Sequence, residues 1–235
     1  ESEPKVYHNA CENAHQVFSQ PTGGAKFSHN NKYANYTFET AREGNGLRIY
    51  NSSHQENRYA RLILYTFYPD KNMPDFSQGT ITFYAKAKGG WRGKKLNTHT
   101  EAAFYFYFMP GTYLKFFGGS KTKKTVITFY YNNKLNFRTT ITENAMPLVK
   151  IRWDFNDYND PNYNKRPNLY LYLDNKQSAR IISTNKTRDR NLLNSRFHHI
   201  LWFKLEAEVT DGGSHGSKDV ASMLDEIRIW KKVVY

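Results

Sequence analysis

The sequence predicts an all-β protein, a β-jelly-roll sandwich of two antiparallel sheets with a concave basic groove. Three observations lead to this fold class. Short strand-like runs recur from about residue 24 onward, separated by clusters of Gly, Asn, Asp and Pro, which is typical of sandwiches and barrels. The chain holds 18 Tyr and 16 Phe but only 4 Met, a balance that favours strands over helices. Several runs also alternate apolar and polar side chains, as strands with one buried face do.

The clearest strand-like runs follow one another along the chain, with turn-forming residues between them. We expect strands at residues 47–51, 58–68, 79–86, 100–108, 113–117, 124–131, 134–141, 150–155, 168–174, 180–183, 197–209 and 223–231. Helix is scarce, and residues 9–18 and 191–196 each have room for only a short turn. No repeat, linker or composition break divides the chain. We therefore expect one catalytic domain over residues 1–235, a length that β-sandwiches reach undivided.

Alternation assigns two faces to the strand that follows residue 99. Phe104 and Phe106 share one face of this run, and His99, Tyr105 and Tyr107 share the other. Aromatic rings exposed to water are held there at a hydrophobic cost, whereas sugars offer apolar C–H patches and hydroxyl groups that such rings can contact. The face that carries Tyr and His therefore indicates a binding surface. Simple cross-strand packing of the tyrosines is the alternative.

A later run predicts a strand that is apolar on one side and basic on the other. Leu135, Phe137 and Ile141 are expected on one face, and Lys134 and Arg138 on the opposite face. A further run, Leu-Tyr-Leu-Tyr-Leu, repeats the pattern with tyrosines in place of the cations. Several strands are thus expected to combine one apolar face with one face of Tyr, Lys and Arg.

The chain is strongly basic, with 34 Lys and Arg against 21 Asp and Glu and a formal net charge of +13. Such an excess commonly indicates an acidic partner: a nucleic acid, an anionic lipid surface or an anionic glycan. The sequence contains no nucleic-acid-binding motif and no run of roughly 18 apolar residues that would form a membrane helix. We therefore expect a monomer whose partner is an acidic polysaccharide, with no nucleic acid and no membrane. A solvated basic surface without a specific partner is the alternative.

Cysteine usage and the first residues bear on the compartment. Cys11 is the single cysteine, so no internal disulfide can form, which is usual in reducing compartments. The chain opens Glu-Ser-Glu-Pro without Met, as a chain does after removal of a signal peptide. A composition rich in Asn and Tyr points in the same direction. We expect a secreted protein, extracellular or periplasmic.

Four segments carry the pattern of a known superfamily. They read Gly-Thr-Ile-Thr-Phe-Tyr-Ala-Lys-Ala at 79–87, Pro-Asn-Leu-Tyr-Leu-Tyr-Leu-Asp-Asn at 167–175, Phe-His-His-Ile-Leu-Trp-Phe at 197–203 and Leu-Asp-Glu-Ile-Arg-Ile-Trp at 224–230. In order and spacing they resemble the concanavalin A-like (laminin G-like) jelly rolls, from about residue 45 to the last residue. The resemblance implies the sandwich fold and says little about function.

Glycoside hydrolases, polysaccharide lyases and non-catalytic lectin-like modules share that superfold. The hydrolases carry a Glu-x-Asp-x-x-Glu or Glu-x-Asp-x-Glu strand with the catalytic carboxylates. The nearest match here, Glu206 and Glu208, lacks the Asp between them. Hydrolysis is therefore not expected.

The region 86–138 is densely basic, and its Tyr113-Leu-Lys115 element resembles the Tyr-x-Lys strand at the cleft of lyases that act on alginate, glucuronan or ulvan. The Gln-Ile/Val-His triplet of alginate lyases is absent. The resemblance implies a polysaccharide lyase that cleaves a uronate-containing acidic polysaccharide such as ulvan, with or without sulfate groups, by β-elimination. The alternative is a non-catalytic, lectin-like module that binds anionic glycans with the same face.

β-Elimination next to a uronic acid needs a base for the C5 proton, a donor for the leaving oxygen and a group that neutralises the carboxylate. Lys115 is the candidate base, because the aromatic residues around it can partly desolvate its ammonium group. Tyr105 and Tyr107 are the candidate proton donors, and His99 is a candidate base or neutraliser.

Substrate binding is assigned to further cations and aromatic residues. Arg138 suits a uronate or a sulfate group, because a guanidinium can bind either in a bidentate manner. The other candidates are Lys134, Tyr113, His198 and Arg61. All of them lie in or beside the expected strands.

No cofactor is required by this chemistry, and a metal enters only through the resemblance. The superfold allows a structural calcium ion (Ca2+) near Asp225 in the last expected strand. A zinc site at His198 and His199 is not expected, because adjacent residues of a regular strand point to opposite faces.

Overall fold

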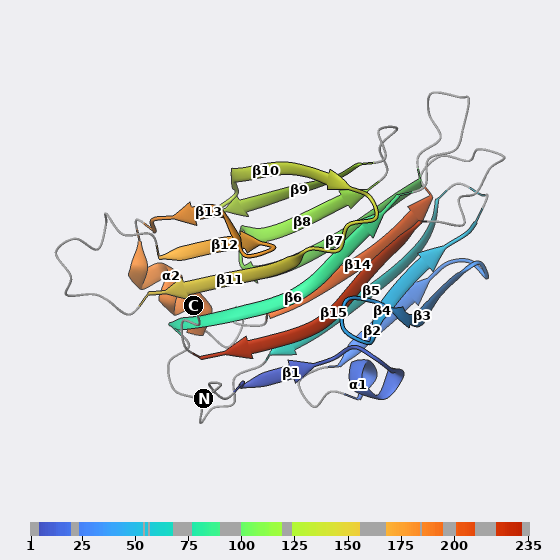
Figure 1. Ribbon diagram of the computed structural model, residues 1–235, viewed down its shortest axis with the longest axis horizontal. Helices are drawn as coiled ribbons and strands as arrows, with labels where there is room; N and C mark the ends of the chain where they lie inside the picture. The colour runs from blue at the N-terminus through green and yellow to red at the C-terminus, as the bar shows by residue number, and fades with distance from the viewer. Residues whose placement is uncertain are drawn as a thin grey trace.

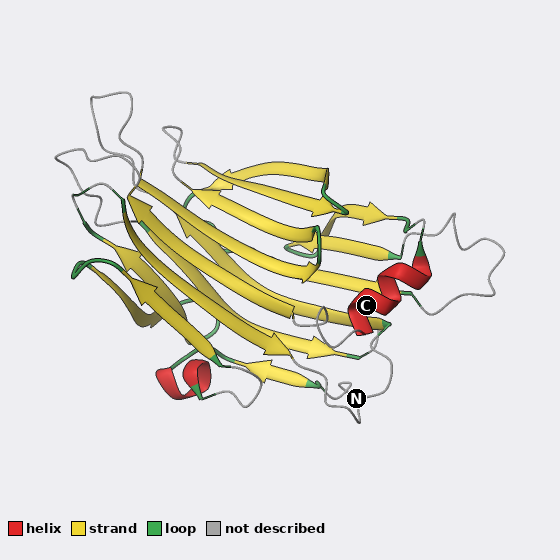
Figure 2. Ribbon diagram, turned by 180° about the vertical axis from the view of Figure 1, so that it is seen from behind, coloured by secondary structure: helices red, strands yellow, loops and turns green. Residues whose placement is uncertain are grey.

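In the computed structural model, two antiparallel sheets pack face to face (Figure 1). The structure describes residues 5–19, 24–53, 55, 57–67, 77–89, 100–118, 124–155, 168–183, 185–194, 201–209 and 220–231. Within these residues strands dominate, and the two short helices lie at the periphery of the sandwich (Figure 2). The predicted all-β sandwich of jelly-roll type is confirmed.

One sheet has eight strands, and its centre is formed by the last strand that the structure describes. In spatial order its strands are β13 (Lys176–Ile181), β12 (Leu169–Leu173), β11 (Leu148–Asp154), β6 (Gln78–Lys88), β15 (Ala221–Trp230), β4 (Asn45–Asn51) and β3 (Ala34–Thr40), with β1 (Tyr7–Asn9) also paired to β15. β15 therefore lies between β6 on one side and β4 and β1 on the other.

The second sheet has seven strands and carries most of the predicted site. Its spatial order is β10 (Lys134–Thr142), β9 (Lys124–Tyr131), β8 (Thr112–Gly118), β7 (Thr100–Met109), β14 (Leu201–Val209), β5 (Arg58–Phe67) and β2 (Ala25–His29). Strands β7 to β10 follow one another both along the chain and across the sheet. Consecutive antiparallel pairing of this kind needs only short connections.

The helices differ in part from the expected turns. α1 (Ala14–Phe18) begins after Asn13, whose side chain accepts a hydrogen bond from the backbone N–H of Gln16, as N-cap residues do. α2 (Lys186–Asn194) begins before the expected residues 191–196, because the side chain of Asn185 accepts from the backbone N–H of Arg188 at 2.9 Å. No helix in the described part of the chain is long and apolar enough to cross a membrane.

Interlocking phenylalanines join the two sheets. Phe83 on β6 lies 5.7 Å, 5.2 Å and 4.9 Å, between ring centroids, from three phenylalanines of the facing sheet, namely Phe104, Phe106 and Phe203. All four side chains are buried. Burial stabilises the fold by roughly 1.5–3 kcal/mol for each such side chain.

Tight turns set the register of two hairpins. Asn132 and Asn133 link β9 to β10, and Asp174 and Asn175 link β12 to β13. All four residues have positive φ angles of 48° to 62°. Two consecutive residues in the left-handed region form the type I′ turn, which favours Asn and Asp and matches the twist of paired strands.

A bulge in β10 overturns one part of the alternation prediction. Leu135 pairs with Tyr130 and Phe137 pairs with Phe129, so the register shifts between them. Since neighbouring residues of β9 point to opposite faces, Leu135 and Phe137 do as well. Leu135 is 52% exposed, whereas Phe137 packs against the core. The prediction that both share one face is wrong, because a bulge inserts an extra residue, here Asn136, into the pairing.

Candidate functional site

Five aromatic side chains cross the outer face of the seven-stranded sheet, the face that points away from the core. We call them the aromatic row: Tyr65 on β5, Trp202 on β14, Tyr107 on β7, Tyr113 on β8 and Tyr130 on β9. Each is the direct cross-strand partner of the next. The row therefore runs across the strands, with one ring on each of five adjacent strands.

Neighbouring rings of the aromatic row touch one another. The Trp202 and Tyr107 rings stack with centroids 3.8 Å apart and planes 9° apart. Tyr113 stacks on Tyr130 at 4.8 Å and lies 5.5 Å from Tyr107, while Tyr65 lies 6.3 Å from Trp202. Because neighbours cover part of each other's faces, the row offers ring edges, phenolic hydroxyls and an indole N–H to a partner. These groups can donate hydrogen bonds.

A second line of residues runs beside the aromatic row, two positions along each strand. We call it the basic row: Lys204 on β14, Tyr105 on β7, Lys115 on β8, Thr128 on β9 and Arg138 on β10. The Lys204 and Lys115 ammonium nitrogens lie 4.2 Å and 5.3 Å from the centroid of the Tyr105 ring. Lys115 also lies 5.1 Å from the Phe117 ring. Attraction between a cation and an aromatic face helps to hold the cation in place.

One acidic side chain lies beside the basic row and neutralises part of it. Glu206 on β14 accepts a hydrogen bond from Arg61 Nε at 2.9 Å and pairs with Lys204 Nζ at 3.2 Å. Among the residues that the structure describes, no carboxylate pairs with Lys115 or Arg138. These two cations are thus available to an acidic partner.

Two phenols of the aromatic row, those of Tyr107 and Tyr113, have raised pKa values. Burial, followed by the negative charge of Glu206 and the neighbouring Tyr113, raises the pKa of Tyr107 to about 12. Burial also raises the pKa of Tyr113, with a smaller contribution from Tyr130. At neutral pH both groups are hydrogen-bond donors, and neither phenol is suited to act as a base.

The structure brings the largest part of the predicted site together. Lys115, Tyr105, Tyr107 and Tyr113 lie side by side on β7 and β8. Arg138 lies further along the basic row, opposite Thr128.

The remaining predicted residues are scattered or not described. Arg61 is on the same outer face, on β5, but is engaged by Glu206. Lys134 is exposed and pairs with Tyr131, whose ring packs against the core. Directly paired residues share a face, so Lys134 is not on the outer face that carries the two rows. His99 and His198 lie outside the described residues.

Sequence reasoning missed several members of the two rows. Trp202 and Lys204 are the two direct neighbours of the buried Phe203. Alternation along this predicted strand therefore places both side chains on the face opposite to Phe203. Tyr65 and Tyr130 lie in predicted strands as well. Their meeting with Tyr107 and Tyr113 depends on which strands are neighbours and in which register, and a single sequence does not give either.

Asp225 lies in the other sheet and has a structural role there. Its Oδ2 accepts hydrogen bonds from the backbone N–H groups of Arg42 and Glu43, at 3.1 Å and 3.0 Å, and so fixes the turn before β4. The pKa of Asp225 is raised to about 6, and burial is the largest cause. The negative charges of Glu226 and Glu43 raise it further, whereas the two backbone hydrogen bonds act in the opposite direction.

The second oxygen of Asp225 bears on the predicted calcium ion. This Oδ1 is buried, and no group in the described part of the chain hydrogen-bonds to it. A calcium ion would satisfy such an oxygen. However, the described residues contain no group of three His, Cys, Asp or Glu side chains that could hold a metal. Calcium at Asp225 stays a prediction.

The fold is similar to those of several solved proteins. The catalytic domain of an endo-1,3-beta-glucanase (laminarinase) from Thermotoga petrophila RKU-1 has a TM-score of 0.51 at 12% identity, covering 97% of this chain and 98% of that one. The laminarinase catalytic domain from Thermotoga maritima MSB8 has a TM-score of 0.50 at 13% identity, covering 100% of both chains. The binding domain of botulinum neurotoxin serotype D has a TM-score of 0.50 at 10% identity. In that comparison 98% of this chain is covered, but it spans only 48% of the toxin domain.

No family model and no curated protein sequence matches the chain. At identities of 10% to 13%, the structural similarity shows the fold alone. This fold serves both enzymes and binding domains, so it does not determine a function.

Proposed function

We propose that this protein binds an acidic polysaccharide along the outer face of the seven-stranded sheet. The observation that carries the proposal is the aromatic row lying directly beside the basic row. A sugar chain crossing the strands would contact ring edges and hydroxyl donors along one row. Its carboxylate or sulfate groups would meet ammonium and guanidinium groups along the other. The similarity in fold to laminarinase catalytic domains agrees with a carbohydrate-related role.

The charges of the basic row favour an acidic ligand over a neutral one. Lys115 and Arg138 have no carboxylate partner among the described residues, and a neutral sugar would leave both cations without one. An acidic sugar supplies the missing charge, and complementary charges of this kind determine which partner binds.

The proposal is tested by removing one ring of the aromatic row. Tyr113→Ala should weaken binding of oligouronates about tenfold or more, since a central aromatic side chain in a binding site contributes roughly 2 kcal/mol. Titration calorimetry against fragments of alginate, ulvan, glucuronan and glycosaminoglycans measures the loss.

Tyr33→Ala is the matched control for that experiment. Tyr33 is 43% exposed and lies outside both rows, in the turn between β2 and β3. Its removal should leave the affinity unchanged. Equal losses in both variants, or no binding of any acidic fragment by the wild type, would contradict the proposal.

A second function, that of a polysaccharide lyase, is favoured by the surroundings of Tyr105. Two ammonium groups lie close to its ring, and the Tyr107 ring stacks beside it at 5.8 Å. Lys115, the candidate base, therefore lies directly beside Tyr105, a candidate proton donor. Tyr107, with its pKa of about 12, suits the role of proton donor.

The elimination that we propose as this second function needs no further reagent. The base removes the C5 proton of the uronate, the C4–C5 double bond forms, and the bond from C4 to the bridging oxygen breaks. The donor then protonates that oxygen. The guanidinium group of Arg138, further along the basic row, would stabilise the charge that develops on the uronate carboxylate.

Activity and binding can be compared in three variants. Tyr105→Phe and Tyr107→Phe keep most of the side-chain bulk and all of the cations, so bound substrate should remain within a few-fold of the wild-type affinity. Lys115→Met also removes one cation from the basic row, so its affinity for an acidic substrate should fall as well. Turnover should fall by about 100- to 10,000-fold, as expected for a lost acid or base. The ultraviolet absorbance of the unsaturated uronate reports the rate.

Two results would limit the lyase proposal. If the wild type binds acidic glycans but forms no unsaturated product from any of them, the protein is a binding module and the lyase proposal is wrong. If turnover survives all three substitutions, the reaction takes place elsewhere in the molecule.

A further inference from the structure

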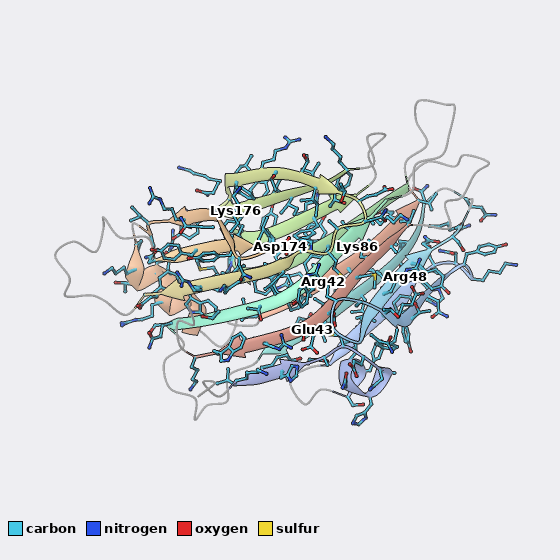
Figure 3. The ribbon with its side chains drawn as sticks, in the orientation of Figure 1. Arg42, Glu43, Arg48, Lys86, Asp174 and Lys176 are labelled. Atoms are coloured by element: carbon cyan, nitrogen blue, oxygen red, sulfur yellow. The ribbon has the colours of Figure 1, made fainter. Side chains whose placement is uncertain are left out.

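A second basic site lies on the other side of the sandwich, on the outer face of the eight-stranded sheet. A hollow of about 220 Å³ is found there, lined by side chains of β3, β4, β6 and β15. Met223 and Ala221 of β15 form its floor. Met223 pairs with Lys86 on one side and with Arg48 on the other. The two cations therefore come from the strands that flank β15, as the labels in Figure 3 show.

The dimensions of the hollow follow from strand spacing. Lys86 and Arg48 are separated by two strand intervals, which places their backbones roughly 10 Å apart. Ala221 pairs with Lys88, and its small side chain leaves room between the longer ones. A small ion can thus lie above β15 and be reached from both sides.

Positive charge exceeds negative charge around the hollow. Lys86, Lys88 and Arg48 line it together with one carboxylate, Glu39. Glu39 pairs with Arg48 at 3.3 Å, but its side chain is 49% exposed, so solvent screens the pair strongly. Lys86 is half-buried, and burial, followed by the nearby charges of Lys88 and Arg48, lowers its pKa. An anion in the hollow would relieve the repulsion among the three cations.

We propose that this hollow binds a tetrahedral oxyanion, a sulfate or phosphate group, between Lys86, Lys88 and Arg48. Three donor groups that approach from two sides suit the several oxygens of a tetrahedral anion, and Arg can donate two parallel hydrogen bonds. The site is independent of the function proposed for the opposite face, because no residue is shared between them.

The direct test uses inorganic sulfate and inorganic phosphate as probes, at an ionic strength held constant with chloride. Both anions should shift the backbone amide signals of residues 221–223 in nuclear magnetic resonance titrations. Lys86→Met should weaken this binding about tenfold, since hydrogen bonds to charged groups contribute roughly 1.5–3 kcal/mol. Arg48→Met should have a similar effect and provides a second variant if the first does not fold.

Lys176→Met is the matched control, because it removes the same charge from the same sheet. Lys176 is exposed at the start of β13, at the far edge of the sheet from β4. Its loss should leave the anion affinity unchanged. The proposal is overturned if neither anion binds the wild type, or if Lys176→Met weakens binding as much as Lys86→Met does.

The source of the oxyanion is decided by competition. A sulfated oligosaccharide that competes for the hollow should displace inorganic sulfate from the wild type and from Tyr113→Ala alike, because Tyr113 lies on the opposite face of the sandwich. Displacement that is unchanged in Tyr113→Ala identifies a sulfate ester bound by the hollow itself. Binding of the inorganic anions without any displacement identifies a free anion. Each of these results supports the anion site. If the anion site were absent, the function proposed for the outer face of the seven-stranded sheet would be unaffected, because the two share no residue.

Discussion

Asp225 shows how one buried carboxyl makes stability depend on pH. Its pKa is raised from an ordinary value of 3.8 to about 6 in the folded protein. Between these two values the folded chain binds more protons than the unfolded chain. The contribution of Asp225 to stability is therefore fully present below about pH 4 and is lost as the pH rises through about 6.

Asp225→Asn should remove this dependence. The free energy of unfolding of the wild type, measured relative to that of the variant, should fall by on the order of 3 kcal/mol between pH 4 and pH 7. Urea unfolding of both proteins at pH 4, 5, 6 and 7 measures the difference between their free energies of unfolding. Parallel curves would show that Asp225 titrates normally. The pKa of Glu43 is lowered chiefly by its hydrogen bond with Arg228, so its contribution to stability increases as the pH rises. This contribution is present in both proteins and cancels in the difference between them.

At the scale of residues, sequence reasoning identified side chains better than it identified their neighbours. Tyr105, Tyr107, Tyr113 and Lys115 were found because local alternation puts them on one face, and the structure keeps them together. Lys134 was assigned to the site by the same rule. Its pairing with Tyr131 places it on the other side, because the bulge in β10 reverses the alternation beyond it.

Helix α2 is attached to the seven-stranded sheet by one buried acid. Asp189 is fully buried and accepts hydrogen bonds from Tyr131 at the end of β9, from Ser183 and from the neighbouring Arg188. Burial and the hydrogen bond to Asp189 raise the pKa of Tyr131 well above its ordinary value. The acid thus connects β9, the end of β13 and the first turn of α2.

Asp189→Asn should destabilise this connection. An amide cannot accept all of these hydrogen bonds and leaves Arg188 without its counter-charge, so the free energy of unfolding should fall by about 3 kcal/mol. Urea unfolding measures the loss. Glu39→Gln, which removes an exposed carboxylate, should change stability by less than about 0.5 kcal/mol. A similar loss in both variants would show that Asp189 is not the connection described here.

At the scale of elements, strand positions were largely predictable and pairing was not. The run predicted at 124–131 matches β9, and most other strands differ from prediction by a few residues at their ends. β1, β2 and β3 were missed as individual strands, whereas α1 lies within the residues 9–18 where a helical turn was expected. Alternation and turn residues are local signals, whereas the order β10-β9-β8-β7-β14-β5-β2 depends on contacts between distant segments.

For the whole molecule, the net charge of +13 predicts a strong dependence of binding on salt. Attraction between exposed charges is screened over about 10 Å at 0.1 M salt. The affinity for an acidic glycan should therefore fall steeply between low and moderate sodium chloride concentrations. Calorimetric titrations at several salt concentrations measure the slope.

The comparison ligand for that measurement is duplex DNA. Affinity for the glycan that does not change with salt would show that the positive charge has no part in binding. Equal affinity for DNA and for the glycan would favour a nucleic-acid partner. Lys115→Met should reduce the slope for the glycan, because it removes one cation from the basic row.

The positions of β14 and β15 have a consequence for how the chain folds during synthesis. β14 lies between β7 and β5, and β15 lies between β6 and β4, so the two strands occupy the middle of the two sheets (Figure 1). Until residues 201–230 leave the ribosome, each sheet exists as two separate halves with open inner edges. Open edges pair readily with other chains, and pairing between distant segments is slow. The nascent chain is therefore most exposed to aggregation before β14 and β15 are synthesised. These two strands then join the halves of both sheets within a short interval of translation.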